Sequence, residues 1–515
     1  MENYYNYSLC FIFILIFLFL TKQNKSKPKL PPSPSLWTMA CNLRALMHAP
    51  HSTLAHLAQT HGPLISLRLG QHQTIIASSS TTAESILKTH DRDLSGRVIH
   101  PSYQYHLRGF IEHSLVWSQP NDQWRKLRRI LHSELLGQRM MKAQAWIREK
   151  KVVEMVNGLK ERKEGGVVDV GQVVFETMLS LFCELVFSCG LDGLEMSGSE
   201  LKKDVWRFME FMGKGGFRMQ DHVPFLVKLF GGGKRDNNSV GLVMNRVIRS
   251  WEGIITRRRS MRSESGRGSD FLDILLGCGY SDIEINVFLL EILAAGTDTT
   301  ATTIEWAMSE LIKHPKSMSK LNQELQQVVL LHQEQQEQNQ DCSKDVQIIR
   351  ESHLPHLHHL HACINETFRL HPPAPLLPHY ALNSCQLMGY EIPKGYPVIV
   401  NIWAIGRDPE VWKNPLEFLP ERFCSNEDKE GYWCNNKVEY NGSDFRLIPF
   451  GSGRRMCPGI GLAEKVVPLI LASLVHGFEW RLTDGMELED VQMNAKFGLT
   501  MKKDPPLLLL HKVKN

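Results

Sequence analysis

The sequence predicts a mainly α-helical domain with small β-sheets, preceded by one N-terminal transmembrane anchor. Long segments with apolar residues at helical spacing dominate the chain, whereas the strand-like alternating segments are short. One uninterrupted apolar run, Leu9–Leu20, lies near the N-terminus. We find no internal repeat and no linker within the body. We therefore divide the chain into an anchor (1–21), a basic patch with a proline hinge (22–36) and a single domain (37–515).

The composition is that of a globular protein. Of the 515 residues, 43% are hydrophobic and 22% are charged, which excludes a disordered chain, a collagen and a coiled-coil rod. The net charge of +4 is too small for a dedicated nucleic-acid binder. The mean hydropathy of −0.23 excludes a protein with many membrane spans but not one with a single span. The eleven cysteines include no CxxC pair, which fits a reducing compartment.

The apolar run at the N-terminus is long enough to enter a membrane. Together with Tyr4–Ser8 it gives about 17 residues, or roughly 26 Å of helix, against a bilayer core of about 30 Å. Glu2 is the only charged residue before it, and four lysines follow it: Lys22, Lys25, Lys27 and Lys29. The positive-inside rule then places the body in the cytosol. A cleaved secretory signal is the alternative, but a basic n-region and an A-x-A-like site are missing.

The elements of the body follow from periodicity and from turn residues. Residues 64–78 alternate around a Leu-Gly-Gln-His turn and predict a β-hairpin. Helices are predicted over 122–160, 171–190, 283–314 and 356–370, with a last one from Pro458-Gly459 to about His476, and short strands near 386–400. Within 283–314, we expect Gly296 and its threonine neighbours to loosen the hydrogen-bond ladder of the helix.

The segment Phe450–Gly459 (FGSGRRMCPG) carries the strongest chemical signal. Cys457 lies in a turn flanked by glycines, directly before a predicted helix. Gly453 and Gly459 can adopt φ > 0 and so direct backbone N–H groups at the sulfur. The helix N-terminus and Arg455 favour an anion, so we expect the thiol to ionise easily. Such a thiolate can be a nucleophile, which needs a paired base, or an axial metal ligand, and the residues alone leave both open.

Three further motifs accompany this cysteine. Glu366 and Arg369 are spaced i, i+3 on one helical face, and Arg422 in a Pro-Glu-Arg-Phe sequence offers a second arginine. The long helix carries Ala-Gly-Thr-Asp-Thr-Thr at 295–300. Trp124 and Arg128 place an indole and a guanidinium one turn apart.

In this order and spacing the four motifs resemble the cytochrome P-450 superfamily of haem-thiolate monooxygenases, and the resemblance spans the chain. It implies that Cys457 is the axial thiolate ligand of the iron of haem b. It implies that Arg455, Arg128 and Trp124 are partners of the haem propionates, and His379 stands where the family usually has a propionate-binding Arg or His.

The resemblance also implies roles for the remaining motifs. Glu366, Arg369 and Arg422 correspond to the buried charge network that holds the haem-binding loop. Asp298 and Thr299 correspond to the pair that relays protons for dioxygen reduction. The implied partners are O₂, a small lipophilic substrate and an NADPH-cytochrome reductase, which supplies electrons from NADPH. The implied location is the endoplasmic reticulum membrane, with a single pass and a cytosolic catalytic domain.

The sequences of several segments are similar to those of the alkaloid-oxidising branch of the plant microsomal A-type enzymes. These segments are Leu94–Arg97, Cys385–Tyr390, Tyr440–Gly442 and Pro468–His476. We therefore expect oxidation of a plant specialised metabolite, an alkaloid, by hydroxylation, phenol coupling or radical rearrangement. A terpenoid or phenolic hydroxylase is the alternative, because Thr303–Met308 is shared with terpenoid hydroxylases. A non-catalytic haem-binding paralogue is a different-class alternative, and the presence of Asp298 and Thr299 argues against it.

By the same resemblance, the substrate pocket is lined by the 97–117 loop, 290–299, 374–377 and 497–500. The expected contacts there are Ala295, Ala374, Leu376 and Leu499. The loop His371–Pro378 is one residue shorter than is usual in the family.

Glu291 is a more specific candidate. It lies one turn before Ala295 on the same helical face, where a carboxylate can meet the protonated amine of an alkaloid. The alternative is a structural acid bonded to a neighbouring segment.

Overall fold

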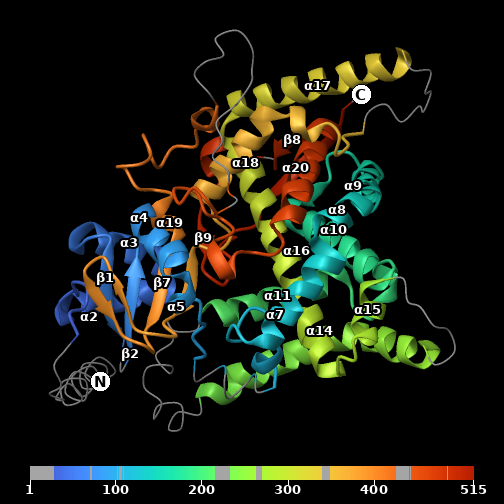
Figure 1. Ribbon diagram of the computed structural model, residues 1–515. Helices are drawn as coiled ribbons and strands as arrows, with labels where there is room; N and C mark the ends of the chain where they lie inside the picture. The colour runs from blue at the N-terminus through green and yellow to red at the C-terminus, as the bar shows by residue number, and fades with distance from the viewer. Residues whose placement is uncertain are drawn as a thin grey trace, which may run out of the picture.

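The computed structural model describes residues 28–514, except 70–71, 101–102, 104–106, 108, 215–231, 263–269, 339–347, 425–439, 441 and 484. The predicted anchor, 1–21, lies outside the described residues. The predicted fold class is confirmed: many helices surround a few small sheets (Figure 1).

The element bounds follow the chain. The helices are α2 (Leu36–His48), α3 (Pro50–His61), α4 (Ser80–Glu84), α5 (Asp91–Leu94), α7 (Asp122–Leu131), α8 (Gln138–Ala143), α9 (Ala145–Lys160), α10 (Val170–Phe187), α11 (Gly198–Gly213), α14 (Gly232–Arg262), α15 (Phe271–Gly277), α16 (Asp282–Lys313), α17 (Pro315–Gln338), α18 (His358–Leu370), α19 (Ile402–Ile405) and α20 (Ile460–Gly477). The strands are β1 (Leu64–Leu69), β2 (His72–Ala77), β3 (Val167–Asp169), β4 (Leu376–Tyr380), β5 (Cys385–Leu387), β6 (Tyr390–Ile392), β7 (Pro397–Asn401), β8 (Phe478–Leu482), β9 (Ala495–Lys496), β10 (Lys502–Lys503) and β11 (Leu508–Val513).

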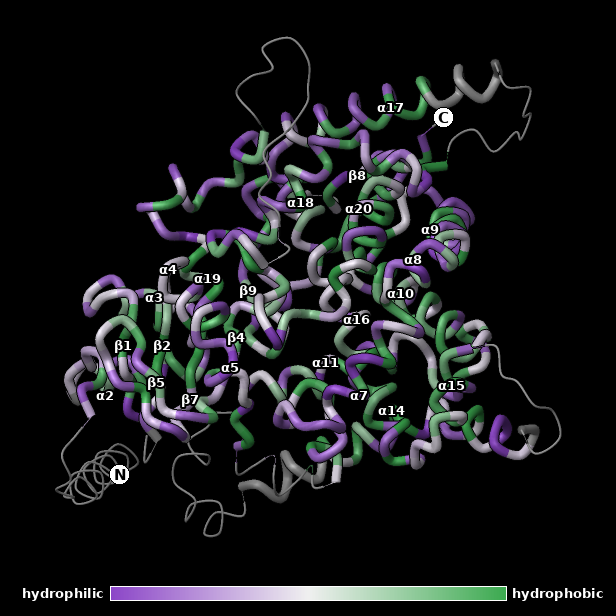
Figure 2. Tube along the Cα trace, in the orientation of Figure 1, coloured by the Kyte–Doolittle hydropathy of each residue, from purple (hydrophilic) through white to green (hydrophobic). Residues whose placement is uncertain are grey.

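Helix α16 runs through the middle of the molecule and packs against α10 and α20 (Figure 1). It begins with a capping box, in which Ser281 and Glu284 each bond the other's backbone N–H. It ends before Pro315, which opens α17, because proline cannot continue a helix but fits its first turn. Figure 2 shows α10 mainly apolar at the centre and α9 mainly hydrophilic at the edge.

Helices α10, α16 and α20 are long and apolar enough to cross a membrane by length and composition alone. Their most apolar windows are, however, 72%, 83% and 61% buried inside the protein. Their apolar residues form the main core, and burial on all sides accounts for their composition.

The largest sheet has the strand order β1-β2-β7-β4. The predicted hairpin is confirmed, since β1 and β2 pair antiparallel from Leu64↔Ala77 to Leu69↔His72. Strand β2 then pairs parallel with β7, and β4 pairs antiparallel with it. A second sheet joins β3, β11 and β8. The strand β4, between α18 and β7, brings the 376–380 segment to the edge of the larger sheet.

The proline segment before α2 is attached to this sheet. The carbonyls of Pro31 and Pro32 accept hydrogen bonds from Ser66 Oγ and Ser66 N, both at 2.8 Å. The carbonyl of Lys29 accepts one from Glu391 N at 2.9 Å. The part of the predicted hinge that the structure describes is therefore docked along β1, and α2 follows it with Trp37 77% exposed.

The expected loosening at Gly296 is not what the structure has, because α16 is continuous there. A Cβ on Gly296 would lie 2.3 Å from the ring of Phe182 in α10. The glycine thus allows two core helices to approach closely. Thr297 and Thr299 donate their hydroxyl groups to the carbonyls of Leu293 and Ala295, one turn earlier, at 2.7 and 2.6 Å.

Candidate functional site

Cys457 lies at the end of a tight loop before α20. Its N–H donates to Phe450 O at 2.9 Å and closes the loop. Gly451 and Gly453 have φ of 69° and 68°, and a Cβ on Gly453 would lie 2.3 Å from Leu87 O. Only glycine fits there without displacing the backbone. The prediction for Gly459 is wrong: its φ is −85°, and its N–H reaches the sulfur from an ordinary conformation.

The electrostatics of this sulfur also differ from the expectation of easy ionisation. Burial raises the pKa of the Cys457 thiol, and the opposing effects of the Gly459 N–H and of Arg128 do not compensate for it. The groups that act on this pKa include no imidazole or carboxylate that could serve as a base. A thiol with a raised pKa and no such base among the described residues that act on it is a poor nucleophile, whereas a metal ion can take the place of its proton.

Three arginines gather beside the cysteine loop, each held by backbone carbonyls. Arg97 Nε donates to Val116 O at 3.1 Å and Nη1 donates to Pro378 O. Arg128 Nη2 donates to Met456 O at 2.9 Å, and Arg455 donates to Ser95 O and Ser118 O at 2.8 and 2.6 Å. Burial and mutual repulsion lower the pKa of Arg97 to about 9 and of Arg455 to about 10.

Sequence reasoning missed Arg97 as a site residue. It was included only in the Leu94–Arg97 segment that resembles the alkaloid-oxidising branch and at the start of the 97–117 pocket loop, because nothing near it in the sequence marks it as a neighbour of Cys457. The only sequence signal was its residue type, because arginine is the residue that Arg128 and Arg455 also contribute beside the cysteine loop.

Trp124 and His379 complete this cluster as neutral groups. The Trp124 indole N–H donates to Leu115 O at 2.9 Å, so its ring, and not its N–H, faces the cations. That ring lies 4.5 Å from the Arg455 guanidinium and 5.2 Å from that of Arg128. Burial and the charges of Arg97 and Arg455 lower the pKa of His379 to about 3, and its Nδ1 is 2.9 Å from Leu94 O. His379 is therefore a neutral hydrogen-bond donor.

Glu366, Arg369 and Arg422 meet in one buried network. Arg369 donates to Glu366 through Nε at 2.7 Å and Nη2 at 2.8 Å, and Arg422 Nε donates at 2.9 Å. The Leu419 N–H adds a fourth bond to this carboxylate at 2.7 Å. The remaining guanidinium donors hold carbonyls of the 406–417 segment: Gly406, Lys413, Asn414, Pro415 and Glu417. The network fastens this segment to α18.

The middle of α16 presents an open face. Ala295 is exposed although the residues before it and Thr297 and Asp298 after it are buried, and Thr299, one turn later, is half-buried. Asp298 points elsewhere: its carboxylate accepts a hydrogen bond from the Thr500 hydroxyl. Burial raises the pKa of Asp298, against the effects of Thr500, Lys502 and Lys202.

Glu291 is fully occupied by protein groups. Its oxygens accept hydrogen bonds from Ser114 Oγ and from Leu115 N at 2.6 Å, with Val116 N at 3.4 Å. Burial raises its pKa to about 7. The geometry is that of a structural acid that ties α16 to the 114–116 segment, and it leaves no free oxygen for a substrate amine.

The other expected substrate contacts come from two segments that lie near each other. Ala374, Leu376 and Leu499 are each half-buried. Met501 N donates to Pro373 O at 2.7 Å, which joins the 497–501 loop to the 373–377 segment. Leu499 N donates to Met209 O at 3.0 Å and joins the same loop to α11.

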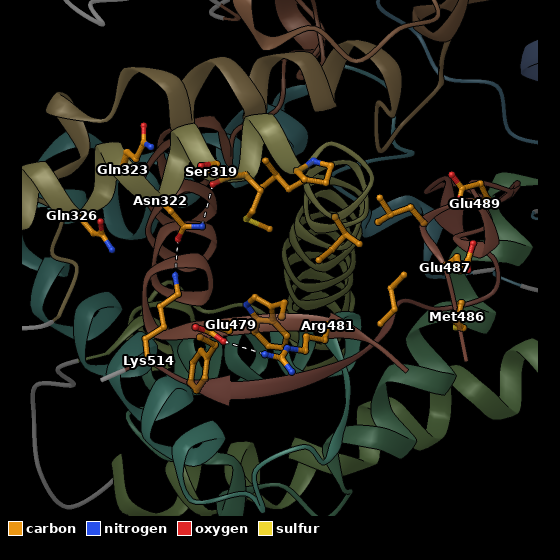
Figure 3. Close-up of a pocket in the computed structure, with 18 residues that line it drawn as sticks. Ser319, Asn322, Gln323, Gln326, Glu479, Arg481, Met486, Glu487, Glu489 and Lys514 are labelled. Carbon is orange, nitrogen blue, oxygen red and sulfur yellow. Dashed lines mark hydrogen bonds and ion pairs between the residues drawn. The ribbon is translucent and has the colours of Figure 1, made fainter. Parts of the chain in front are cut away.

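A groove of about 1020 Å³ lies between α17 and β8 (Figure 3). Polar side chains surround it, with Lys514 bonded to Asn322 at 2.6 Å and Arg481 3.7 Å from Glu479. None of the predicted site residues lines it. It is therefore separate from the cysteine site.

The comparisons with known proteins agree with this geometry. A family model described as cytochrome P450 matches residues 31–510. The chain belongs to the cytochrome P450 family. A solved zebra fish cytochrome P450, described as a structure with progesterone, has the same fold, with a TM-score of 0.69 over 90% of this chain and 99% of that one, at 23% identity.

The curated P450 relatives are closer in sequence. A probable (S)-N-methylcoclaurine 3'-hydroxylase isozyme 2 from Coptis japonica is 43% identical, covering 95% of this chain and 94% of the relative. Corytuberine synthase from Coptis japonica is 39% identical and berbamunine synthase from Berberis stolonifera is 37% identical, each covering 95% of this chain and 96% of the relative. The expected resemblance to the alkaloid-oxidising branch is confirmed, and this P450 is a haem-dependent monooxygenase.

The residues of this P450 fit its haem. Arg455 Nη1 is buried and has no hydrogen-bond partner among the described residues. Two guanidinium groups beside it, those of Arg97 and Arg128, are likewise held in place by carbonyls and not by acids. A group with two carboxylates satisfies this excess of cationic donors. The exposed Ala295 in a buried helix marks space for its ring.

Proposed function

We propose that this P450 is a membrane-anchored monooxygenase that oxidises a small lipophilic alkaloid. The observation that carries the proposal is the identity of 43% to a 3'-hydroxylase of N-methylcoclaurine over 95% of the chain. Hydroxylation, phenol coupling and radical rearrangement are all open to it, since synthases and hydroxylases stand at similar identity. The alkaloid assignment does not rest on Glu291, whose carboxylate is bonded to the 114–116 segment.

The proposed binding of haem b uses four residues. Cys457 would supply the thiolate ligand of the iron, and Arg97, Arg128 and Arg455 would bind the propionates. The Trp124 ring lies within cation–π distance of Arg128 and Arg455, and His379 donates to Leu94 O beside them. Bound haem supplies dioxygen activation, with two electrons that come from NADPH through a reductase. The Glu366–Arg369–Arg422 network keeps the loop before the cysteine in register.

The proposed proton path ends on α16. Each turnover takes up two protons, because RH + O₂ + 2 e⁻ + 2 H⁺ gives ROH + H₂O. The two electrons and one of the protons come from the oxidation of NADPH to NADP⁺ at the reductase. Asp298 holds a proton at its carboxyl and Thr299 delivers it from its hydroxyl toward the open face beside Ala295. Ala374, Leu376 and Leu499 orient the substrate and exclude water through apolar contact.

The proposed location is the endoplasmic reticulum membrane. Residues 1–21 anchor the chain in a single pass, residues 22–36 connect the anchor to the body, and the domain 37–515 faces the cytosol. The lysines after the apolar run and the absence of Lys or Arg before it support this orientation. The cytosolic face also gives an NADPH-cytochrome reductase access to the domain.

A terpenoid hydroxylase is a second candidate function. Geraniol 8-hydroxylase from Catharanthus roseus is 37% identical, covering 93% of both chains. The decisive experiment reconstitutes the protein with reductase and NADPH and measures turnover of benzylisoquinolines, tropane esters and monoterpenols. Turnover of a benzylisoquinoline supports the proposal, and turnover of monoterpenols alone contradicts it.

The assignment of Cys457 has its own test. We expect Cys457→Ala to lose the thiolate-type spectrum of the reduced carbon monoxide complex and all activity. Cys278→Ala, at an exposed free cysteine, is the matched control and should keep both. An unchanged spectrum in Cys457→Ala would show that another residue binds the iron.

A further inference from the structure

Thr500 is the one side chain hydrogen-bonded to the Asp298 carboxylate within the described residues. Both side chains are almost fully buried, Asp298 at 3% exposed and Thr500 at 1%. The two residues come from distant parts of the chain, α16 and the loop before β10. A single hydroxyl thus fixes the orientation of a buried carboxyl that must otherwise turn freely about its side-chain bonds.

The loop around Thr500 is held on both sides. Leu499 N donates to Met209 O at 3.0 Å, Met501 N donates to Pro373 O at 2.7 Å, and the Trp306 indole donates to Met501 O at 3.0 Å. The fit against α11 is close, because a Cβ on Gly213 would lie 1.8 Å from Leu499 N. The hydroxyl of Thr500 therefore has little freedom to leave Asp298.

Charged groups continue outward from this pair. Lys202 in α11 and Lys502 both act on the carboxyl of Asp298. The ammonium of Lys202 lies 3.6 Å from Asp169 at the start of α10, and the side chains of Lys202 and Asp169 are 12% and 34% exposed. Glu305 lies about two turns after Asp298 on α16, and the same two lysines and Asp169 act on the pKa of its carboxyl. The buried pair therefore lies in the electrostatic field of both lysines, and the Lys202–Asp169 ion pair lies nearer the surface.

We propose that Thr500 is a positioning residue that holds the Asp298 carboxyl in the orientation from which it supplies a proton toward the open face of α16. This inference rests on the proposed role of Asp298 as a proton carrier. Thr500 acts through Asp298 and need not touch the substrate, although its neighbour Leu499 is an expected substrate contact. The loop therefore joins substrate contact and proton supply in adjacent residues.

The consequence of losing the proton supply is measurable as uncoupling. When protons arrive too slowly at the correct atom, O₂ + NADPH + H⁺ gives H₂O₂ + NADP⁺ and no product. Thr500→Val removes the hydroxyl at nearly constant volume, and Thr500→Ser restores it. We expect Thr500→Val to lower product per NADPH about tenfold, as for one lost hydrogen bond to a charged group, with peroxide rising to match.

Two readouts separate positioning from a structural effect. Thr500→Val should raise the solvent deuterium isotope effect on product formation, and Thr500→Ser should return both coupling and isotope effect toward wild type. Thr177→Val is the matched control, because it also removes a buried hydroxyl, one bonded to Val173 O at 2.8 Å within α10. Similar uncoupling in Thr177→Val and Thr500→Val, or no rescue by serine, would overturn the positioning role.

Asp298→Asn distinguishes the inference from its premise. If Asp298→Asn stays coupled, the proposed proton carrier is wrong, and if it uncouples while Thr500→Val does not, only the inference fails.

Discussion

Replacing Glu366 by glutamine should destabilise the fold more than any comparable exposed change. The carboxylate is 0% exposed and accepts four hydrogen bonds, three from guanidinium groups and one from Leu419 N. Glutamine keeps the shape, but it leaves the charges of Arg369 and Arg422 without their anion and turns an NH₂ group toward donors. Breaking a buried ion pair in this way costs about 3–5 kcal/mol, which lowers the folding equilibrium constant by on the order of 10²- to 10⁴-fold.

The measurement is a urea titration of the haem-loaded protein, followed by tryptophan fluorescence and by the reduced carbon monoxide spectrum. Glu417→Gln is the matched control: the same chemical change in the same segment, on an exposed side chain whose backbone carbonyl still binds Arg369. We expect the control to change the free energy of unfolding by less than about 0.5 kcal/mol. If Glu366→Gln and Glu417→Gln unfold within about 1 kcal/mol of each other, the energetic reasoning is wrong.

Three further predictions concern the haem edge, the buried acid on α16 and the anchor. Arg97→Leu should reduce haem content more than Arg68→Leu, a half-buried arginine on β1, because only Arg97 joins the cluster at Cys457; equal haem content would remove Arg97 from the site. The pKa of Glu291 is about 7 in the fold, above the 4.5 of a free glutamate, so the folded state binds more protons between these values and its stability falls as pH rises through them. Glu291→Gln should remove this dependence; parallel stability profiles of variant and wild type from pH 5 to pH 8 would contradict the reasoning. Deletion of residues 1–29 should leave haem binding intact and lower membrane partitioning; loss of haem at good expression would count against a passive anchor.

Much of the site could be predicted because its chemically important residues belong to short contiguous motifs. Cys457 with its glycines and Glu366 with Arg369 are local motifs, and the turn or helix that contains them fixes their geometry. Arg97 and Thr500 could not be found in this way. Each acquires its neighbours through contacts between segments hundreds of residues apart, and neither has an unusual local sequence.

Other differences come from competition between local and tertiary effects. A glycine in a helix loosens it in isolation, but at Gly296 the packing of Phe182 decides the residue type and the helix stays continuous. A helix N-terminus and an arginine favour a thiolate at Cys457, but desolvation of the half-buried sulfur outweighs both and raises the pKa of the thiol. The spacing of Glu291 and Ala295 gave the correct helical face but not the 114–116 segment that covers the acid.

The attachment of the proline segment to β1 changes how the anchor and the body are coupled. Pro31 and Pro32 are bonded to Ser66 in β1, and Lys29 is bonded to Glu391 in β6, so only about seven residues of sequence separate the predicted anchor from the docked segment. Such a chain reaches no further than roughly 25 Å when fully extended. A connection this short, attached at one edge of the domain, restricts how far the domain can rotate relative to the anchor. If residues 1–21 anchor the chain as proposed, this edge of the sheet, with the exposed Trp37 beside it, stays close to the bilayer, and a lipophilic compound that leaves the membrane approaches the protein from that side.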